Sequence, residues 1–143
     1  MSMFVRSCLL CVLMSASALP AFATPDKPLY DRLGGMEQIV DIVGKTIDRT
    51  ASDPRTRRSF EGISLAPVKA SVVQHLCQLT GGPCRYEGAP IAKAHTGLAI
   101  TANEFDIMDG YLAEELAAHG VAADDRAELQ KLLGPMKPDV VGK

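Results

Sequence analysis

The sequence predicts an all-α fold, on the basis of the spacing of its apolar residues and the positions of its glycines and prolines. Apolar residues recur at intervals of three and four in several segments, which is the spacing of one face of an α-helix. Glycine and proline are grouped between these segments, where they end helices. We find no segment that alternates apolar and polar residues as a half-buried strand would. The 143 residues have the length of one ordinary domain.

Composition excludes two classes of protein. A formal net charge of -2 argues against a nucleic-acid partner, because domains that bind polyanions usually carry a strongly basic face. A hydrophobic content of 47% excludes a wholly disordered chain, which would be poorer in apolar residues.

Residues 1–23 predict a secretory signal peptide. Arg6 precedes an uncharged apolar segment, and Ala21 and Ala23 supply the small residues that signal peptidase reads. The apolar segment is too short for a membrane span, which needs ~20 residues. We therefore expect residues 24–143 to form one exported domain without a membrane span, with a bacterial periplasm as its destination.

Export changes the interpretation of the cysteines. Cys8 and Cys11 would leave with the signal peptide, so Cys77 and Cys84 remain. An even pair in an oxidising compartment favours a disulfide between them. The alternative is two reduced thiols, each buried separately.

The first half of the domain is expected to hold two long helices. A helix over 36–50 is predicted by one apolar stripe of Met36, Ile39, Val40, Val43 and Ile47. Asp53-Pro54 then begins a short helical turn with the aspartate as its cap. Ser64 is placed to cap the next helix, which Gly81-Gly82-Pro83 ends. Its apolar stripe consists of Leu65, Val68, Val72, Leu76 and Leu79.

The second half begins with an ordered loop over 81–90 and a short helix over 91–98. Thr101 and Glu104 then form a capping box, which opens a helix that ends near His119. We expect this helix to bury Phe105, Met108, Leu112 and Leu116. A final helix, ended by Pro138, has a stripe of Leu129, Leu132, Leu133 and Met136.

The histidines differ in their surroundings. His119 lies at a helix C-terminus, where a positive charge is stabilising, so its role is interpreted as structural. His75 lies at the edge of an apolar stripe and is either a half-buried surface residue or a group that reaches into a pocket. His95 lies in a short apolar helix beside Ala94 and Gly97. It is either a core histidine or the ligand of a haem iron, because a single imidazole can hold iron when a macrocycle supplies the other ligands.

Several short motifs resemble those of group I truncated haemoglobins in order and spacing. They are Leu29-Tyr30-Asp31-Arg32-Leu33-Gly34-Gly35, Asp53-Pro54, Phe60-Glu61-Gly62, Gly81-Gly82-Pro83, Tyr86-Glu87-Gly88 and Lys93-Ala94-His95. The resemblance covers about 29–140. It implies a truncated globin fold, a two-over-two helical sandwich around haem, and a function in binding O2, NO or CO, for oxygen transport or NO detoxification.

The resemblance also implies roles for individual residues. His95 matches the proximal ligand of the haem iron, and Phe60 matches the phenylalanine on the haem face. Further positions expected to contact the cofactor are Val68, Val72, Leu76, Tyr86, Ile91, Phe105 and Met108. No Cys-x-x-Cys-His motif occurs, so the cofactor expected is a non-covalent haem b.

The distal side departs from the family pattern of a tyrosine and a glutamine. The matching positions hold Ile47, Val68 and Val72, none of which can donate a hydrogen bond. Loss of one such hydrogen bond to O2 costs ~1–3 kcal/mol, which weakens the retention of O2 roughly 5- to 150-fold. Oxygen storage is therefore less favoured than gas binding in general. His75 is the nearby candidate for a donor or a sixth ligand, although we expect five-coordinate ferrous haem.

Enzymatic activity and a haem-free function are the alternatives. An NO dioxygenase would need bound O2 and an unidentified electron donor, and a peroxidase would need an acid–base residue, for which His75 is the candidate. The alternative from another class is a secreted helical interaction module that no longer binds haem. Retention of His95, Phe60 and Phe105 favours the haem protein.

Overall fold

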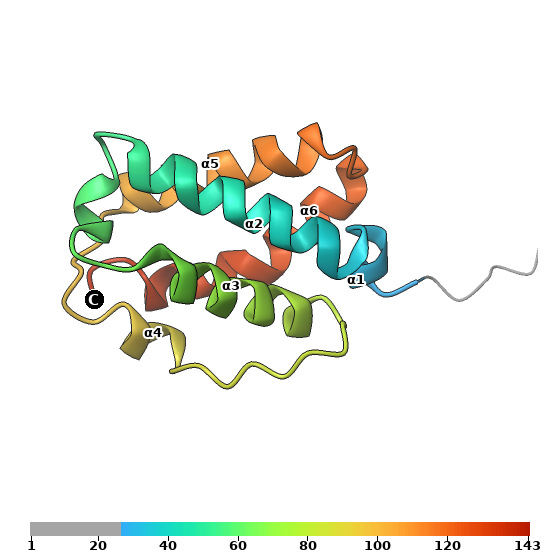
Figure 1. The fold of residues 1–143 in the computed structure, drawn as a ribbon, viewed down its shortest axis with the longest axis horizontal. Coiled ribbons are helices and arrows are strands. Elements are labelled where there is room, and N and C mark those ends of the chain that lie inside the picture. The colour runs from blue at the N-terminus through green and yellow to red at the C-terminus, as the bar shows by residue number, and fades with distance from the viewer. Residues whose placement is uncertain (1–26) are drawn as a thin grey trace, which may run out of the picture.

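The computed structural model describes residues 27–143, so the signal peptide prediction lies outside the described residues. The elements in chain order are α1 (Leu29–Arg32), α2 (Gly35–Ser52), η1 (Arg57–Phe60), α3 (Leu65–Leu79), α4 (Ile91–Ala94), α5 (Ala102–Ala118), α6 (Ala123–Leu133) and η2 (Gly134–Asp139), where η marks a 3-10 helix (Figure 1). Over the described residues there is no strand, only an isolated bridge between Ile100 and Val141. The all-α prediction is confirmed.

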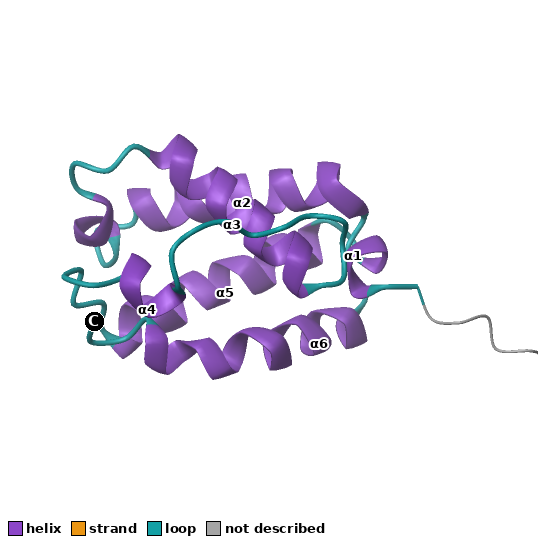
Figure 2. Ribbon diagram, turned by 90° about the horizontal axis from the view of Figure 1, so that it is seen from below, coloured by secondary structure: helices purple, strands orange, loops and turns teal. Residues whose placement is uncertain are grey.

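The helices form two layers of two. α2 packs against α3 in its own layer and also against α5 in the other layer. α5 and α6 lie side by side as the second pair (Figure 2). This is the two-over-two sandwich expected from the sequence. No helix in the described part of the chain has the length and apolar content that a membrane crossing requires.

The buried face of α2 differs from the predicted stripe. Met36 and Val40 are 39% and 49% exposed, so the prediction was wrong for these two residues. Contact with both α3 and α5 buries a broader face instead, which consists of Ile39, Ile42, Val43, Thr46, Ile47 and Thr50. The buried threonines satisfy their hydroxyls inside the helix: Thr46 Oγ1 donates to the Ile42 carbonyl and Thr50 Oγ1 to the Thr46 carbonyl.

α3 has two apolar faces rather than one. Val73, Leu76 and Cys77 are buried in the core. The other members of the predicted stripe, Leu65, Val68, Val72 and Leu79, are only half-buried. Of these residues, Val68, Val72 and also the buried Leu76 line a cavity, whereas Leu65 and Leu79 pack against the core without lining it. Ser64 is the N-cap residue as predicted, but its side chain makes no capping hydrogen bond.

α5 begins as the sequence indicates. Thr101 Oγ1 accepts a hydrogen bond from the Glu104 amide, and the Glu104 carboxylate accepts one from the Thr101 amide. At the other end His119 is the C-cap residue, the position at the helix C-terminus that the sequence predicted. Of the four residues expected to be buried, only Leu116 is; Phe105, Met108 and Leu112 are half-buried because they line the cavity.

The short elements were the least predictable. The helix expected over 91–98 ends at Ala94, and His95 is its C-cap residue. The turn predicted at Asp53 contains no α-helix; Asp53 Oδ1 accepts a hydrogen bond from the Arg55 amide, and helical geometry starts at Arg57. Met136 lies in η2 instead of the preceding α-helix.

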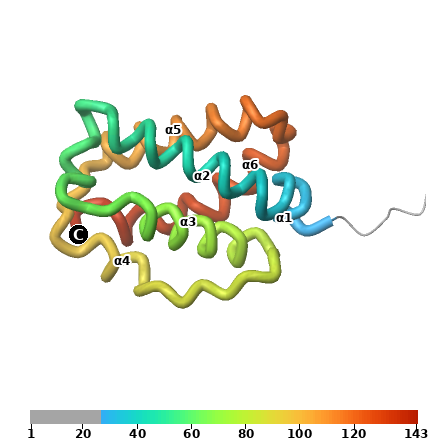
Figure 3. Tube along the Cα trace, in the orientation of Figure 1, coloured from blue at the N-terminus to red at the C-terminus, as the bar shows by residue number. Residues whose placement is uncertain are grey.

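The segment 81–90 contains no helix and runs back along α3 from its C-terminal end to α4 (Figures 1 and 3). It leaves α3 through Gly81, whose φ of 84° favours glycine. Gly82 follows, and a Cβ there would lie 2.5 Å from the Tyr30 ring and 2.7 Å from Cys77 Sγ. Gly81 thus allows the chain to turn sharply, and Gly82 allows its backbone to lie close to Tyr30 and Cys77.

Candidate functional site

A cavity of about 510 Å³ lies between the two helical layers. This volume is in the range of small-molecule and cofactor sites. Its lining is mostly apolar and comes from α2, η1, α3, α4, α5 and the C-terminal helices, together with the loop segment 81–90. The sequence-predicted residues in the lining are Ile47, Phe60, Val68, Val72, His75, Leu76, Tyr86, Ile91, His95, Phe105 and Met108.

His95 lies on the cavity wall at the end of α4, half-buried. Its Nδ1 atom is 2.7 Å from the Ile91 carbonyl oxygen. Because a carbonyl oxygen only accepts, Nδ1 must carry the proton and donate it. In the neutral ring the lone pair then lies on Nε2. A hydrogen bond of this kind fixes the tautomer and orientation of metal-binding histidines.

The wall formed by α2 and α3 is apolar at the positions that matter for a bound ligand. Ile47 is 1% exposed, and Val68 and Val72 present hydrocarbon to the cavity. Thr46 and Thr50 also line it, but their hydroxyl protons are donated to backbone carbonyls of α2.

The sequence reasoning missed Ser71 and Asp109, which also line the cavity. Ser71 is three residues after Val68 and four before His75, so its place in the cavity-facing stripe was visible as a polar interruption of helical spacing. Burial raises the pKa of the Asp109 carboxyl, and the nearby Asp106 raises it further. Asp109 is four residues after Phe105 and three before Leu112, so it likewise interrupts the apolar stripe of α5 that faces the cavity.

His75 is half-buried at the place where α3 approaches η2. Its Nε2 atom is 3.4 Å from the sulfur of Met136. The Tyr86 ring packs edge-on against the imidazole, with 4.9 Å between centroids and an interplanar angle of 72°. Burial lowers the pKa of His75, so the neutral ring is favoured. Nδ1 is buried and has no hydrogen-bond partner within residues 27–143.

A buried carboxylate fastens the turn that follows His95. Arg58 donates to the carbonyls of Leu98 and Ala99 and to the carboxylate of Glu104. Burial alone would raise the pKa of Glu104, but hydrogen bonds from Thr101 and Arg58 bring it below the usual value. The charged pair therefore holds η1, the turn after His95 and the start of α5 together.

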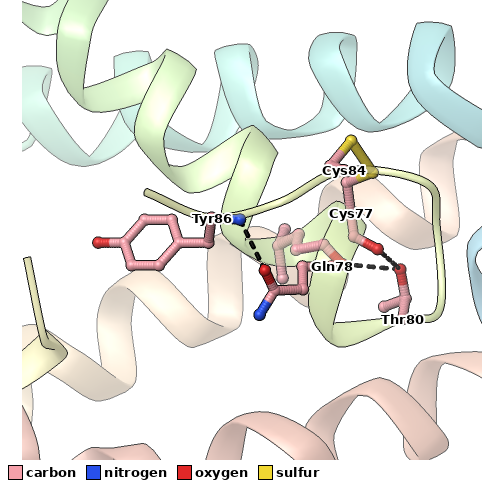
Figure 4. The surroundings of a disulfide bond; sticks show 6 residues. Cys77, Gln78, Thr80, Cys84 and Tyr86 are labelled. Atoms are coloured by element: carbon pink, nitrogen blue, oxygen red, sulfur yellow. Dashed lines mark hydrogen bonds between the residues drawn. A yellow bond between two sulfur atoms is a disulfide. The ribbon is translucent and has the colours of Figure 1, made fainter. Parts of the chain in front are cut away.

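A disulfide joins Cys77, at the end of α3, to Cys84 in the segment 81–90 (Figure 4). Neither cysteine lines the cavity, but Leu76, next to Cys77 in sequence, and Tyr86, two residues after Cys84, do. The Tyr86 amide donates to Gln78 Oε1 at 2.6 Å, which is a second tie between the segment and α3 (Figure 4).

Comparison with known proteins gives matches over almost the whole described region. The family model described as bacterial-like globin matches residues 28–141. The group 1 truncated haemoglobin of Mycolicibacterium paratuberculosis is 31% identical over 112 residues, which cover 78% of this chain and 82% of the relative. That of a Nostoc species is 32% identical over 115 residues, covering 80% of this chain and 98% of the relative.

Solved structures match as well. The Fe(III) form of the truncated haemoglobin from Tetrahymena pyriformis gives a TM-score of 0.77 at 26% identity. The alignment covers 82% of this chain and 100% of the Tetrahymena chain. The 2/2 haemoglobin from a Synechococcus species, a cyanomet structure with covalently attached haem, gives a TM-score of 0.75 at 26% identity, covering 80% and 98%.

Proposed function

Because the chain belongs to the bacterial-like globin family, with group 1 truncated haemoglobins among its relatives, we propose that it binds haem b non-covalently and that His95 is the protein ligand of the iron. The observation that carries the assignment of His95 is its hydrogen bond to the Ile91 carbonyl, which leaves the Nε2 lone pair on the wall of an apolar cavity.

The residues present fit a large flat apolar group. Half-buried apolar side chains face the cavity from both helical layers: Val68 and Val72 from α3, and Phe105 and Met108 from α5. Their contact with haem would bury the apolar area that they expose to the cavity. Phe60, Tyr86, Ile91 and Leu76 complete the proposed contacts. When bound, haem supplies an iron centre at which a diatomic gas binds reversibly.

The chain's own residues bias which gas is retained. Ile47, Val68 and Val72 line the cavity wall formed by α2 and α3, and their side chains have no hydrogen-bond donor. Retention of O2 at a haem iron would depend on such a donor more than retention of NO or CO would. We therefore favour the binding of NO or CO, or a transient contact with O2, over storage of O2.

Visible spectroscopy tests the haem proposal. Purified protein given haem should show a Soret band of a histidine-ligated haem, and His95→Ala should abolish or strongly shift it. His95→Gly should recover the band when free imidazole is added. His119→Ala is the matched control, since it removes a histidine that caps α5 and should leave the spectrum unchanged. A wild-type protein without a Soret band would instead support the haem-free interaction module.

The mode of attachment needs its own measurement, because the Synechococcus relative carries covalently attached haem. Acidified butanone extracts non-covalent haem and leaves the polypeptide at the mass of its sequence. We expect full extraction. An intact mass raised by that of one haem would contradict the non-covalent proposal.

Export is the last part of the proposal. It is supported by the signal-like pattern of residues 1–23 and by a pair of cysteines that an oxidising compartment would keep joined. Expression of the full chain in a bacterium, followed by periplasmic extraction and N-terminal sequencing, should give a soluble protein that starts at Thr24. Recovery of the unprocessed chain in the cytoplasm would contradict it.

A further inference from the structure

The loop segment 81–90 forms part of the cavity wall although it contains no helix. Its contribution to the cavity lining is the side chain of Tyr86. The tyrosine hydroxyl donates to the Ala89 carbonyl at 2.8 Å, a bond within the segment itself. The position of the wall therefore depends on what fastens the segment to α3.

The wall continues from this segment across α3 to η2. Tyr86 packs edge-on against His75, and His75 contacts the sulfur of Met136. Cys77 is two residues after His75, and Cys84 is two residues before Tyr86. The disulfide thus joins α3 to the segment 81–90 at positions two residues along the chain from each partner of the Tyr86–His75 contact. Figure 4 shows the disulfide together with Tyr86.

Besides the Tyr86–His75 ring contact, the segment is held to α3 by hydrogen bonds. The Tyr86 amide donates to Gln78 Oε1 at an exposed site, the Gly81 amide to the Gln78 carbonyl at 3.2 Å, and the Gly82 amide to the Cys77 carbonyl at 2.7 Å. An exposed hydrogen bond contributes little net stability because water replaces it readily. The disulfide is the covalent tie, and it limits the conformations that the loop can adopt.

We propose that the Cys77–Cys84 disulfide is a redox-controlled latch on the Tyr86 wall of the haem cavity: the closed bond retains haem, and its reduction releases the wall and speeds haem loss. The proposal rests on the proposed function, since it concerns the release of the same cofactor.

The two cysteines differ in solvent exposure, and this difference decides which sulfur atom a reductant attacks first. Cys77 is 0% exposed, and Gly82 lies so close that an added Cβ would be 2.7 Å from its sulfur. Cys84 is half-buried. A thiolate of a dithiol reductant therefore attacks Cys84 Sγ, and Cys77 leaves as a thiolate that takes up a proton. The second thiol of the reductant then displaces Cys84 as a thiol. Two electrons and two protons pass to the protein, and the reductant becomes a disulfide.

The test compares haem loss from the two redox forms of the full chain. Haem-loaded protein is reduced with dithiothreitol, alkylated and freed of reductant, and the transfer of ferric haem to excess apomyoglobin is followed in the Soret region. We expect transfer to be about tenfold faster from the reduced form than from the oxidised form. The Cys77→Ala/Cys84→Ala double variant should transfer haem at the fast rate whether or not it receives the same treatment.

Local opening can be separated from unfolding by two further measurements. Hydrogen exchange of the reduced protein should increase in 81–90 while the helical circular dichroism stays at the oxidised value. Equal transfer rates from both forms, each with its Soret band, would overturn the latch and leave the proposed function intact. A loss of helix throughout the protein on reduction would also overturn it, because the bond would then support the whole fold. Absence of a Soret band in both forms would overturn the proposed function itself.

Discussion

The imidazole of His95 takes its chemical character from one backbone contact. Donation from Nδ1 to the Ile91 carbonyl sets the tautomer and leaves Nε2 as the basic nitrogen. His119 has the opposite arrangement, because both of its nitrogens have acceptors, the Glu115 carbonyl and the Asp41 carboxylate. A neutral ring carries one N–H, so two acceptors favour the charged form. Among the described residues, the hydrogen bonds therefore leave one ring nitrogen of His95 without an acceptor, whereas both ring nitrogens of His119 have one.

The apolar wall on α3 can be tested at Val72. Val72→Gln places an amide donor on the cavity wall, where it can reach a ligand on the proposed iron. A gained hydrogen bond of ~1–3 kcal/mol would slow O2 dissociation roughly 5- to 150-fold relative to the wild type. Stopped-flow displacement of O2 by CO measures this rate. Val72→Leu is the matched control, since it changes size without adding a donor and should leave the rate near the wild-type value.

The pH dependence of stability can be tested at His119. The hydrogen bond to Asp41 and then that to the Glu115 carbonyl raise the pKa of His119 above its usual value. A folded-state pKa that is raised means that the stabilisation is complete below about pH 6.5, the unfolded value, and is lost as the pH rises through the folded value. The free energy of unfolding of the wild type should thus exceed that of His119→Gln more at about pH 6 than at about pH 9.

Urea unfolding of both proteins across this pH range measures the difference. A gap between wild type and His119→Gln that widens with rising pH would contradict the assignment, because it would mean that the folded protein favours the neutral ring.

At the scale of elements, the helices differ in how much of their apolar surface belongs to the core. α2 buries six residues in contact with both layers. α3 and α5 each direct one apolar stripe at the cavity, so side chains such as Val68 and Met108 are only half-buried. A pattern of helical spacing identifies such stripes, but it does not distinguish a stripe that meets a neighbouring helix from one that meets a cavity.

The capping box of α5 gives an element-scale prediction. Thr101→Val keeps the shape of the side chain and removes the oxygen that accepts from the Glu104 amide. We expect the free energy of unfolding to fall by about 1 kcal/mol, which is typical of a lost N-cap. Thr101→Ser retains the hydroxyl and should stay within a few tenths of a kcal/mol of the wild type. Equal stability of the two variants in urea titrations would show that the cap contributes nothing.

For the molecule as a whole, the largest feature is the cavity of about 510 Å³ in a domain of modest size. Among residues 27–143 the phenylalanines are Phe60 and Phe105, and both line this cavity. A haem between the layers would add the aromatic bulk that these few side chains do not supply. The stability of the fold is therefore expected to depend on the cofactor.

Thermal unfolding with and without haem tests this dependence. A ligand that binds only the folded state stabilises it by ~2.7 kcal/mol at a free concentration one hundred times its Kd, so the melting midpoint should rise with haem concentration. His95→Ala should lose most of that rise, and His119→Gln should keep it. A wild-type midpoint that does not respond to added haem would contradict a central role of the cofactor in the fold.

The sequence by itself determined the helical class, the position of the long helices, the cap at Thr101 and the set of residues that surround one cavity. The first three follow from local rules of spacing and capping, which act over a few neighbouring residues. The residues around the cavity were expected instead from the resemblance to group I truncated haemoglobins. It did not predict that Met36 and Val40 point outward, that the helix before His95 ends at Ala94, or that Asp109 faces the cavity.

Only the tertiary structure decided these points, because they depend on which helix packs against which face. It also decided the tautomer of His95 and the contact of Tyr86 with His75. The tautomer depends on the geometry of the short helix that ends just before His95, and the Tyr86–His75 contact depends on how the segment 81–90 runs back along α3. No periodic pattern along the chain records either.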